Sequence, residues 1–441
     1  MRVLVTAAPG HGHTFATVPL TWAFRAAGHE VLFATAGRLP GDLPAIVGAG
    51  VTVAEIASRE RMDALREELR ARTLAQARSL GVSPAEMAER NVREAREARH
   101  VRDGNGWAFA ARIFGPMSAG TLDGLVETAT RWRPDLVVFE TMQGGGPLVA
   151  ALLGVPAVEH PIGFARGPQA VDALAGRLAD EYARYGVTAP ARTAALDVSP
   201  PSMAIGPAYG WTMRYVPFNG GGLLPDDLLG AGRPGGVPLG GPAAPLPHRP
   251  RIAVTLGTVL PELGLGGFAP IVAAAARLDA DFVLTADESR LAAAGPLPPN
   301  VRGCGYVPLG ALLASCDAVV HHGGSSTTMT ALDAGLPQLV LPQIADQFIN
   351  ADAVARRGCG LTTDDADAIP EALARLVKDD SLRTAAWEVR AEMAALPTPA
   401  AMADRLARWT ADPQAPAAPA ASPVQAAPHA HAQAHGQGVE T

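Results

Sequence analysis

The sequence has few of the residues that build disulfide-rich domains or bind polyanions. Cysteine occurs 3 times in 441 residues, an odd count without CxxC spacing, which argues against a disulfide framework and indicates reduced thiols. Lysine occurs once and the formal net charge is −7, which gives no support for binding nucleic acid or an anionic membrane. No apolar run approaches the ~18 residues of a membrane span. We therefore expect a cytoplasmic protein whose thiols are Cys304, Cys316 and Cys359.

The composition that is present is typical of a two-domain α/β enzyme. The length exceeds one hydrophobic core, and 48% hydrophobic residues allow ample burial. Strand-like and helix-like runs alternate in both halves, as parallel sheets require. Met1 to Ala8 is too short for a signal peptide and is better explained as a first strand. We predict domains at 1–216 and 251–395, a Gly/Pro-rich linker at 217–250, a helix at 396–411 and a disordered tail at 412–441.

The most informative stretch reads His-His-Gly-Gly-Ser-Ser-Thr-Thr, from His321 to Thr328. It follows an apolar run at 318–320 and precedes a helical pattern. Two glycines let the backbone approach a ligand, the helix N-terminus suits a phosphate, and His322 adds a hydrogen-bond donor. The alternative is an ordinary Gly-rich turn before a helix that is capped by a hydroxyl. The candidate capping residues are Ser326, Thr327 and Thr328.

A second apolar strand pattern, at 338–341, leads to Asp346 and Gln347. Open α/β sheets bind ligands beyond the carboxyl ends of their strands. These two side chains can therefore accept and donate hydrogen bonds to vicinal hydroxyls of a ligand. Alternatively, Asp346 caps the helix that follows, and the two roles are compatible.

The segment from Tyr306 to Gly360 resembles the donor-binding half of glycosyltransferases that use nucleotide-activated sugars. The resemblance implies the GT-B fold, an α/β architecture of two Rossmann-like domains facing each other across a cleft. The family usually has Gly where Ser326 stands, and a serine there would either contact a phosphate or fill space. The matching segments are Tyr306-Val307-Pro308, His321 to Thr327, Ala331 to Gln338, Asp346-Gln347 and Asn350-Ala351.

The N-terminus resembles the same family. In the family, a Gly-His pair in the first loop carries the catalytic base, and Gly12-His13 matches it, so the resemblance implies that His13 is the base. His11 remains the competing candidate. The strand-like segment at 133–140 ends in Glu140, which the resemblance implies would orient His13. The segment 214–220 resembles actinomycete enzymes that attach deoxysugars to antibiotics.

The resemblance also implies a role for each donor-binding residue. Tyr306 would lie against the nucleobase, and the Val307 backbone would read its edge. The histidine–glycine–serine run would hold the diphosphate, and the Asp–Gln pair would hold the sugar. The strand that begins at Arg251 ends beside Thr258, which could reach a phosphate. The full donor-binding set is Gly12, Thr258, Tyr306, Val307, His322, Gly323, Gly324, Ser325, Ser326, Thr327, Asp346 and Gln347.

The acceptor-binding region is the least informative part of the sequence. Residues 58–103 are rich in Arg and Glu at helical spacing, which indicates solvated helix faces or, as in the family, a lid over the acceptor. Four apolar side chains are candidates to line an acceptor pocket, although each would also suit a buried core. They are Trp107, Phe109, Phe114 and Met142.

Rival interpretations of these motifs fail on spacing. A dinucleotide-binding turn needs G-x-G-x-x-G, but Phe15 stands where the third glycine is required, and no acidic residue ends the second strand. Adjacent strand residues point to opposite faces, so His321 and His322 are poorly placed to share a metal ion. We therefore expect no metal site and no cofactor.

The resemblance predicts an inverting, metal-independent glycosyltransferase. It would move a sugar, most simply a deoxysugar, from a dTDP- or UDP-sugar to a lipophilic natural product such as a polyketide. The partners would be these two substrates, with a homodimer or an auxiliary protein left open. One alternative is a catalytically silent relative that activates a partner; it should lose the base or the sugar-binding pair, which this chain keeps. A sugar-nucleotide epimerase or hydrolase would need no apolar acceptor pocket.

Overall fold

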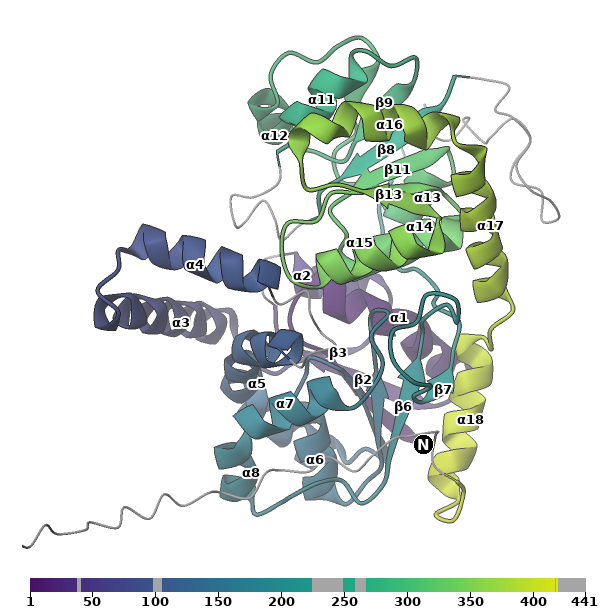
Figure 1. The fold of residues 1–441 in the computed structure, drawn as a ribbon. Helices are drawn as coiled ribbons and strands as arrows, with labels where there is room; N and C mark the ends of the chain where they lie inside the picture. Colours follow the sequence, from purple (N-terminus) through teal and green to yellow (C-terminus); the bar gives the residue numbers. More distant parts are fainter. Residues whose placement is uncertain (38–40, 98–104, 224–248, 258–266, 417, 419–441) are drawn as a thin grey trace, which may run out of the picture.

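The computed structural model describes residues 1–37, 41–97, 105–223, 249–257, 267–416 and 418. Its strands form two separate sheets, of seven strands in the first half of the chain and six in the second. Every strand pair in both sheets is parallel. Figure 1 shows the two α/β units one above the other. The prediction of two α/β domains with parallel sheets is confirmed.

The first sheet has the strand order β3-β2-β1-β4-β5-β6-β7. In the central strand, Val5 pairs with Phe33 on one side and Val138 on the other. Val3 and Val5 enter one core cluster and Leu4 another, because helices cover both faces and a doubly buried strand is apolar throughout. The strands are β1 (Arg2–Thr6), β2 (Glu30–Thr35), β3 (Val53–Glu55), β4 (Leu136–Glu140), β5 (Ala157–His160), β6 (Thr193–Asp197) and β7 (Trp211–Thr212).

The second sheet has the order β10-β9-β8-β11-β12-β13. Its strands are β8 (Arg251–Thr255), β9 (Asp281–Leu284), β10 (Val301–Gly303), β11 (Ala318–His321), β12 (Gln338–Val340) and β13 (Gly360–Thr362). In each sheet the chain order reverses beside the first strand, between β1 and β4 and between β8 and β11. Ligands of open α/β sheets bind beyond the carboxyl ends of strands at such a switch point.

Helices alternate with these strands. The first half contains α1 (His11–Ala26), α2 (Asp42–Gly48), α3 (Arg59–Ser79), α4 (Pro84–Glu97), α5 (Asn105–Trp132), α6 (Gly145–Leu153), α7 (Gln169–Arg177) and α8 (Ala179–Tyr185). The second contains α11 (Ala269–Ala275), α12 (Glu288–Ala293), α13 (Leu309–Leu313), α14 (Ser325–Ala334), α15 (Asp346–Arg357), the 3₁₀ turn η2 (Ala366–Ala368), α16 (Ile369–Lys378), α17 (Asp380–Ala394) and α18 (Pro399–Ala411).

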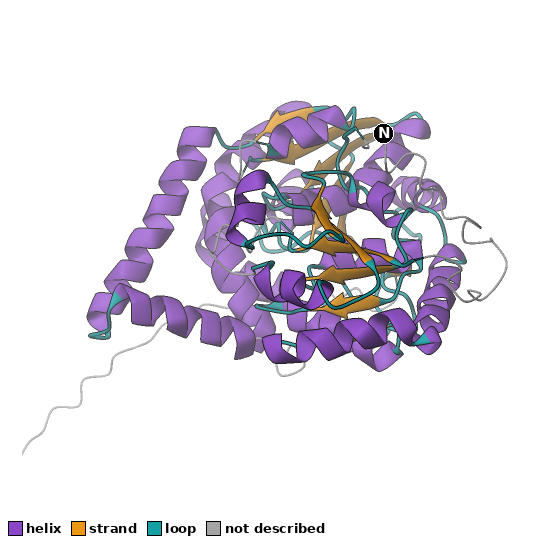
Figure 2. Cartoon of the chain, turned by 90° about the horizontal axis from the view of Figure 1, so that it is seen from above, coloured by secondary structure: helices purple, strands orange, loops and turns teal. Residues whose placement is uncertain are grey.

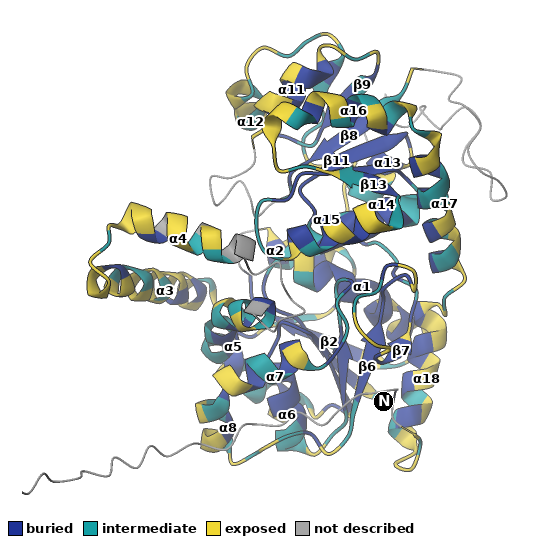
Figure 3. Cartoon of the chain, viewed as in Figure 1, coloured by how far each residue is buried: buried dark blue, intermediate teal, exposed yellow. Residues whose placement is uncertain are grey.

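Helices α3 and α4 form an arm that projects from the first domain (Figures 1 and 2). Most of the surface that α3 presents is exposed (Figure 3). Asp63 forms ion pairs with Arg59 at 3.2 Å and with Arg66 at 2.7 Å on this exposed face. The solvated-helix interpretation of the Arg/Glu-rich region therefore describes α3 well.

Helix α18 returns from the second domain and packs against α1 of the first. The Trp409 ring lies edge-to-face against Trp211 with centroids 5.7 Å apart. The Arg192 guanidinium lies 4.4 Å from the centre of the Trp409 ring and donates to the Trp409 carbonyl at 3.0 Å. Helix α18 is thus held on the first domain.

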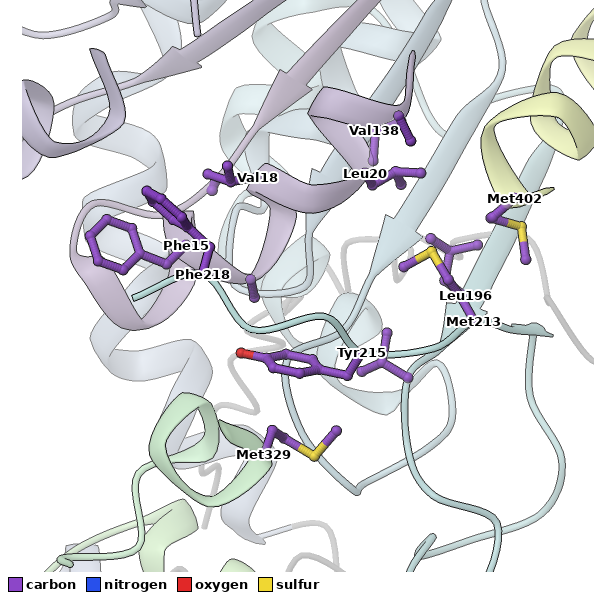
Figure 4. Packing of buried hydrophobic residues seen from close by; sticks show 14 of the residues in the cluster. Phe15, Val18, Leu20, Val138, Leu196, Met213, Tyr215, Phe218, Met329 and Met402 are labelled. Atoms are coloured by element: carbon purple, nitrogen blue, oxygen red, sulfur yellow. The ribbon is translucent and has the colours of Figure 1, made fainter. Parts of the chain in front are cut away.

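Among the described residues, a hydrophobic cluster extends across the interface between the two domains. It joins Val5 and Val138 of the first sheet to Met329 of α14 and Met393 of α17. Figure 4 shows Tyr215, from the segment after β7, beside Met329. The two domains therefore share buried apolar surface in addition to polar contacts.

Candidate active site

A histidine–glutamate pair lies at the switch point of the first sheet. His13 stands in the first turn of α1, and Glu140 is the last residue of the neighbouring strand β4. His13 Nδ1 lies 3.2 Å from Glu140 Oε1. The fully buried carboxylate also accepts the backbone N–H groups of Met142 at 2.9 Å and Ala8 at 3.3 Å. A carboxylate fixed in this way can orient an imidazole and stabilise its protonated form.

The competing histidine forms a different pair. His11 Nε2 lies 3.2 Å from Asp42 Oδ1, at the start of α2, and the His11 ring stacks on Phe15 with centroids 4.5 Å apart. His13 instead lies edge-to-face against Phe114 of α5, at 4.9 Å. His13 therefore contacts Phe114, one of the side chains predicted to bind the acceptor, which favours it over His11 as the base.

Three of the four candidate acceptor residues come together. Met142 is buried in a small apolar cluster with Ala8 and Leu174, and Trp107 and Phe114 pack against it partly buried. The fourth, Phe109, lies outside this cluster, and the Arg112 guanidinium sits 5.2 Å from its ring centre. The cluster adjoins His13 through Phe114, so an apolar acceptor bound there would lie close to the imidazole.

A second histidine pair lies at the end of β11, and its two side chains have separate surroundings. His321 Nε2 lies 2.7 Å from Gln338 Oε1, and the Gly323 N–H donates to His321 Nδ1 at 3.0 Å, so Nε2 carries the proton. Burial lowers the pKa of His321 to about 4. His321 is thus a neutral part of the sheet core.

His322 occupies a site that only glycines leave open. A Cβ on Gly257 would lie 2.5 Å from His322 Cε1, and one on Gly324 would lie 2.5 Å from His322 Nε2. Burial, and then the neighbouring His321, lower the pKa of His322 to about 3. The imidazole is therefore neutral, and it lies at the switch point between β8 and β11, beside the start of α14.

Helix α14 begins earlier than the sequence pattern suggests. Its N-cap is Gly324 and no side chain caps it, so the alternative in which a hydroxyl caps this turn is wrong. Thr328 Oγ1 donates within the helix, to the Gly324 carbonyl at 3.0 Å. Gly335 ends the helix in the left-handed conformation, with φ 67°. An N-terminus without a side-chain cap can accept a ligand anion in its place.

The start of α15 is tied to the start of α14. Ser325 Oγ donates to Asp346 Oδ2 at 2.9 Å, and Asn350 Nδ2 donates to Ser325 Oγ at 3.1 Å and to the Gly323 carbonyl at 2.7 Å. Asp346 keeps an exposed surface, yet the surrounding protein desolvates it and raises its pKa. The charge of His13 acts in the opposite direction, so the two candidate sites lie within electrostatic range of each other.

Asp346 does not cap α15, contrary to the alternative raised by the sequence, because the N-cap is Ala345. Ala345 has φ 52° and ψ −131°, a conformation that residues other than glycine rarely adopt. The buried Gln347 side chain supports this turn: its Oε1 accepts the N–H of Gln343 at 2.9 Å and of Ile344 at 3.2 Å. The Gln347 amide group therefore shapes the loop in front of Asp346, and within the described residues its NH₂ group has no hydrogen-bond acceptor.

The remaining predicted donor residues do not gather at one place in the structure. The exposed Tyr306 donates its hydroxyl to the Asn219 carbonyl at 2.7 Å, which joins the proposed nucleobase wall to the segment between the domains. Val307 is buried in the core of the second domain. The Thr327 side chain is partly buried on α14. Thr258 lies outside the described residues.

Two positions in this region were not assigned a function from the sequence. Asn350 is one helical turn beyond Asp346, and that i,i+4 spacing was a readable signal that both face the same side of α15. Gly257 carries no such signal, because its importance depends on His322, which is distant in sequence. Within the described residues, no group of three or more metal-ligating side chains is placed to hold a metal ion. In the same residues, no helix is long and apolar enough to cross a bilayer.

Two facing Rossmann-like domains, with an imidazole–carboxylate pair at one switch point and a glycine-bounded histidine at the other, define a GT-B glycosyltransferase. The sequence matches the family described as erythromycin biosynthesis protein CIII-like, through its N-terminal domain at 22–233 and its C-terminal domain at 269–408. The chain belongs to this family of glycosyltransferases.

Similar proteins cover almost the whole chain. The elloramycin glycosyltransferase ElmGT of Streptomyces olivaceus is 39% identical over 92% of this chain and 97% of its own. The L-demethylnoviosyl transferase of Streptomyces niveus is 37% identical over 92% and 98%. The crystal structure of the glycosyltransferase SnogD from Streptomyces nogalater has 38% identity and a TM-score of 0.69, covering 93% and 99%. SsfS6 from Streptomyces sp. SF2575, solved with thymidine diphosphate, has 31% identity and a TM-score of 0.70, covering 92% and 99%.

Proposed function

We propose that this enzyme transfers a deoxysugar from a dTDP- or UDP-sugar to a lipophilic natural-product acceptor such as a polyketide, with inversion at the anomeric carbon. The observation that carries the proposal is the pairing of His13 with the buried Glu140, within electrostatic range of Asp346 across the interface. Of the two nucleotides, we favour dTDP for the donor. Two similar proteins, SsfS6 and the spinosyn rhamnosyltransferase SpnG, were solved with thymidine diphosphate.

In the proposed reaction His13 removes the acceptor proton as the acceptor attacks the anomeric carbon. Base catalysis of this kind typically contributes about 10²–10⁴-fold. Glu140 stabilises the imidazolium that forms, because its carboxylate is already fixed by two backbone N–H groups. Direct displacement from the face opposite the leaving group gives inversion. An acceptor seated against Phe114 would lie on the His13 side of the sugar.

The second domain would stabilise the leaving diphosphate. His322 would donate from a neutral imidazole, and the start of α14 would add its backbone N–H groups and partial positive charge. Asp346 and the free NH₂ of Gln347 would bind the sugar hydroxyls. Tyr306 would lie against the nucleobase. The proposal includes no divalent metal, since neutral donors and the helix terminus cover the departing charge.

The first experiment is thermal stabilisation of the purified protein by dTDP, UDP and NAD. A ligand at a hundredfold excess over its Kd adds about 2.7 kcal/mol to stability. We expect a shift with dTDP that exceeds the shift with UDP, and none with NAD. A flat response to both nucleoside diphosphates would overturn the proposed donor site and favour a catalytically silent partner protein instead.

The second experiment separates the two histidines. With a dTDP-deoxysugar and an aromatic polyketide aglycone, His13→Ala should reduce transfer at least 10²-fold while dTDP still binds. Loss of transfer in His11→Ala, with activity kept in His13→Ala, would exchange their roles. The anomeric configuration of the product, read by NMR, tests inversion. Turnover of the sugar nucleotide that is independent of any acceptor would point to an epimerase or a hydrolase.

A further inference from the structure

Helix α14 contacts the rest of the molecule through a polar stripe along one side. Ser326, Thr330 and Asp333 are spaced i, i+4 and i+7, so they lie on one face of the helix. Ser326 Oγ donates to the Gly12 carbonyl at 3.2 Å. Thr330 Oγ1 accepts from Asn219 Nδ2 at 3.1 Å, and Asp333 pairs with Arg214 at 3.3 Å. Helix α14, whose N-terminus is proposed to face the diphosphate, is thus held by side-chain contacts to the first domain and to the segment that joins the two domains.

Ser326 is the member of this stripe that bonds to the turn of α1 containing His13. Its acceptor, the Gly12 carbonyl, belongs to the residue that immediately precedes His13 in the first turn of α1. The family resemblance implies a glycine at position 326, and a glycine has no side chain with which to make this bond. The bond across the domain interface is therefore a property of this chain's own residue.

Neighbouring side chains pack around the helical turn that carries Ser326. Thr330 Oγ1 donates to the Ser326 carbonyl at 2.7 Å, which fixes the helical turn. Burial raises the pKa of Tyr215 to about 12 and the Ser326 hydroxyl acts in the opposite direction, so the two hydroxyls lie close together. Tyr215 itself is buried against Met329 of the same helix. A hydroxyl has one proton to donate, so while Ser326 bonds to Gly12 it does not donate to a phosphate.

We propose that Ser326 is a positioning residue that holds the His13 turn against the sugar-nucleotide domain. The proposal rests on the function proposed above, in which His13 acts on a sugar bound by the second domain. In this role, the Ser326 hydrogen bond helps to set the distance between His13 and the bound sugar. Ser326 is then not one of the groups that bind the diphosphate. Substitutions at Ser326 should therefore change kcat and leave nucleotide affinity unchanged.

The test compares Ser326→Ala, which loses the hydroxyl, with Ser326→Thr, which keeps it. A neutral hydrogen bond contributes about 1 kcal/mol, so we expect kcat to fall about fivefold in Ser326→Ala, with donor KM and the Kd of dTDP within twofold of wild type. Ser326→Thr should restore most of kcat. Thr384→Val is the control, because it removes an exposed hydroxyl that bonds within α17 and not across the domain interface.

A second readout does not need activity. The His13 and Thr14 N–H groups bond to the Gly10 carbonyl within the turn, so amide hydrogen exchange of residues 9–15 reports how firmly the turn is held. Exchange there should be faster in Ser326→Ala and close to wild type in Ser326→Thr and Thr384→Val. Unchanged kcat and unchanged exchange in Ser326→Ala would overturn the proposal, as would an equal loss in both Ser326 variants. A tenfold weaker Kd for dTDP in Ser326→Ala would assign the hydroxyl to the phosphate instead.

The outcome is distinguishable from failure of the proposed function. If the wild-type protein binds no nucleoside diphosphate and transfers no sugar, the proposed function fails whatever Ser326 does. If it binds dTDP and transfers sugar, but exchange at 9–15 and kcat ignore Ser326→Ala, the positioning role alone fails.

Discussion

The His322 ring fits into the structure because glycines at two positions leave space for it. Two glycines, Gly257 and Gly324, border its ring at distances that leave no room for a Cβ. The same enclosure removes water, which lowers the pKa of the imidazole to about 3. A neutral histidine costs less to bury than a charged one and still offers a hydrogen-bond donor. The residue thus provides polarity without a permanent charge where a diphosphate is proposed to bind.

Gly324→Ala should displace this ring. Gly324 has φ −60°, which alanine adopts without strain, so the variant isolates the steric clash with His322 Nε2. We expect the Kd for dTDP to rise at least tenfold in isothermal titration calorimetry, equivalent to about 1.4 kcal/mol. Gly176→Ala on α7 is the matched control, because its new methyl group would meet open space. Wild-type affinity in Gly324→Ala would show that the position of His322 is unimportant for the nucleotide.

Glu159, at β5, should make stability depend on pH. It is buried and accepts hydroxyl bonds from Thr141 at 2.8 Å and Tyr209 at 3.1 Å. Burial raises its pKa from 4.5 to about 7, so the neutral carboxyl is favoured by folding. The stability that depends on this neutral form is fully present below the pKa of Glu159 in the unfolded chain. It is lost as pH rises through the pKa of Glu159 in the folded protein.

We therefore expect the wild type to lose stability relative to Glu159→Gln between about pH 5 and about pH 8, because the amide cannot ionise. Urea unfolding of both proteins across this range measures the difference. Parallel stability curves would mean that Glu159 does not change its protonation on folding in this window. Since Glu140 contributes to the raised pKa, a Glu140→Gln background should shrink the effect.

At the scale of elements, the candidate site lies at the carboxyl ends of strands. The positions of these strand ends could be predicted from the sequence. The apolar runs of β1, β4 and β11 stop at polar or glycine residues, and parallel pairing then brings His13 to Glu140. The turn before α15 could not be predicted. Its conformation at Ala345 depends on a side chain, Gln347, that lies two residues ahead and folds back on the loop. Ordinary N-cap patterns do not encode that contact.

Two substitutions of Gln347 separate its contributions to the loop and to the sugar. Gln347→Glu keeps oxygen acceptors for the N–H groups of Gln343 and Ile344, whereas Gln347→Leu leaves both unsatisfied, at about 1–3 kcal/mol each. We expect the glutamate variant to keep the melting temperature but lose donor affinity, because it has no NH₂ group. The leucine variant should lose both. Equal melting temperatures in the two variants would contradict the loop-holding role.

At the scale of the whole molecule, the interface is a continuous core with polar contacts beside it. The shared hydrophobic cluster spans both sheets, α14, α17 and α18. Contacts such as Ser326 to Gly12 and Arg214 to Asp333 join segments far apart in sequence. Composition and periodicity predict two domains because they report local patterns. They carry no information about which faces of those domains meet, so the contact between the His13 turn and the start of α14 required the assembled structure.

The shared core predicts that the two domains unfold together. Leu122 is buried in a cluster confined to the first domain, and Leu373 in one confined to the second. Replacing either by alanine should remove about 2–5 kcal/mol. In scanning calorimetry we expect one transition, lowered by Leu122→Ala and by Leu373→Ala alike, and raised by saturating dTDP in both variants. If the domains were independent, two transitions would separate, each variant would lower only its own, and dTDP would rescue only Leu373→Ala. A nucleotide bound to one domain that also stabilises the core of the other would show that the two domains are energetically coupled.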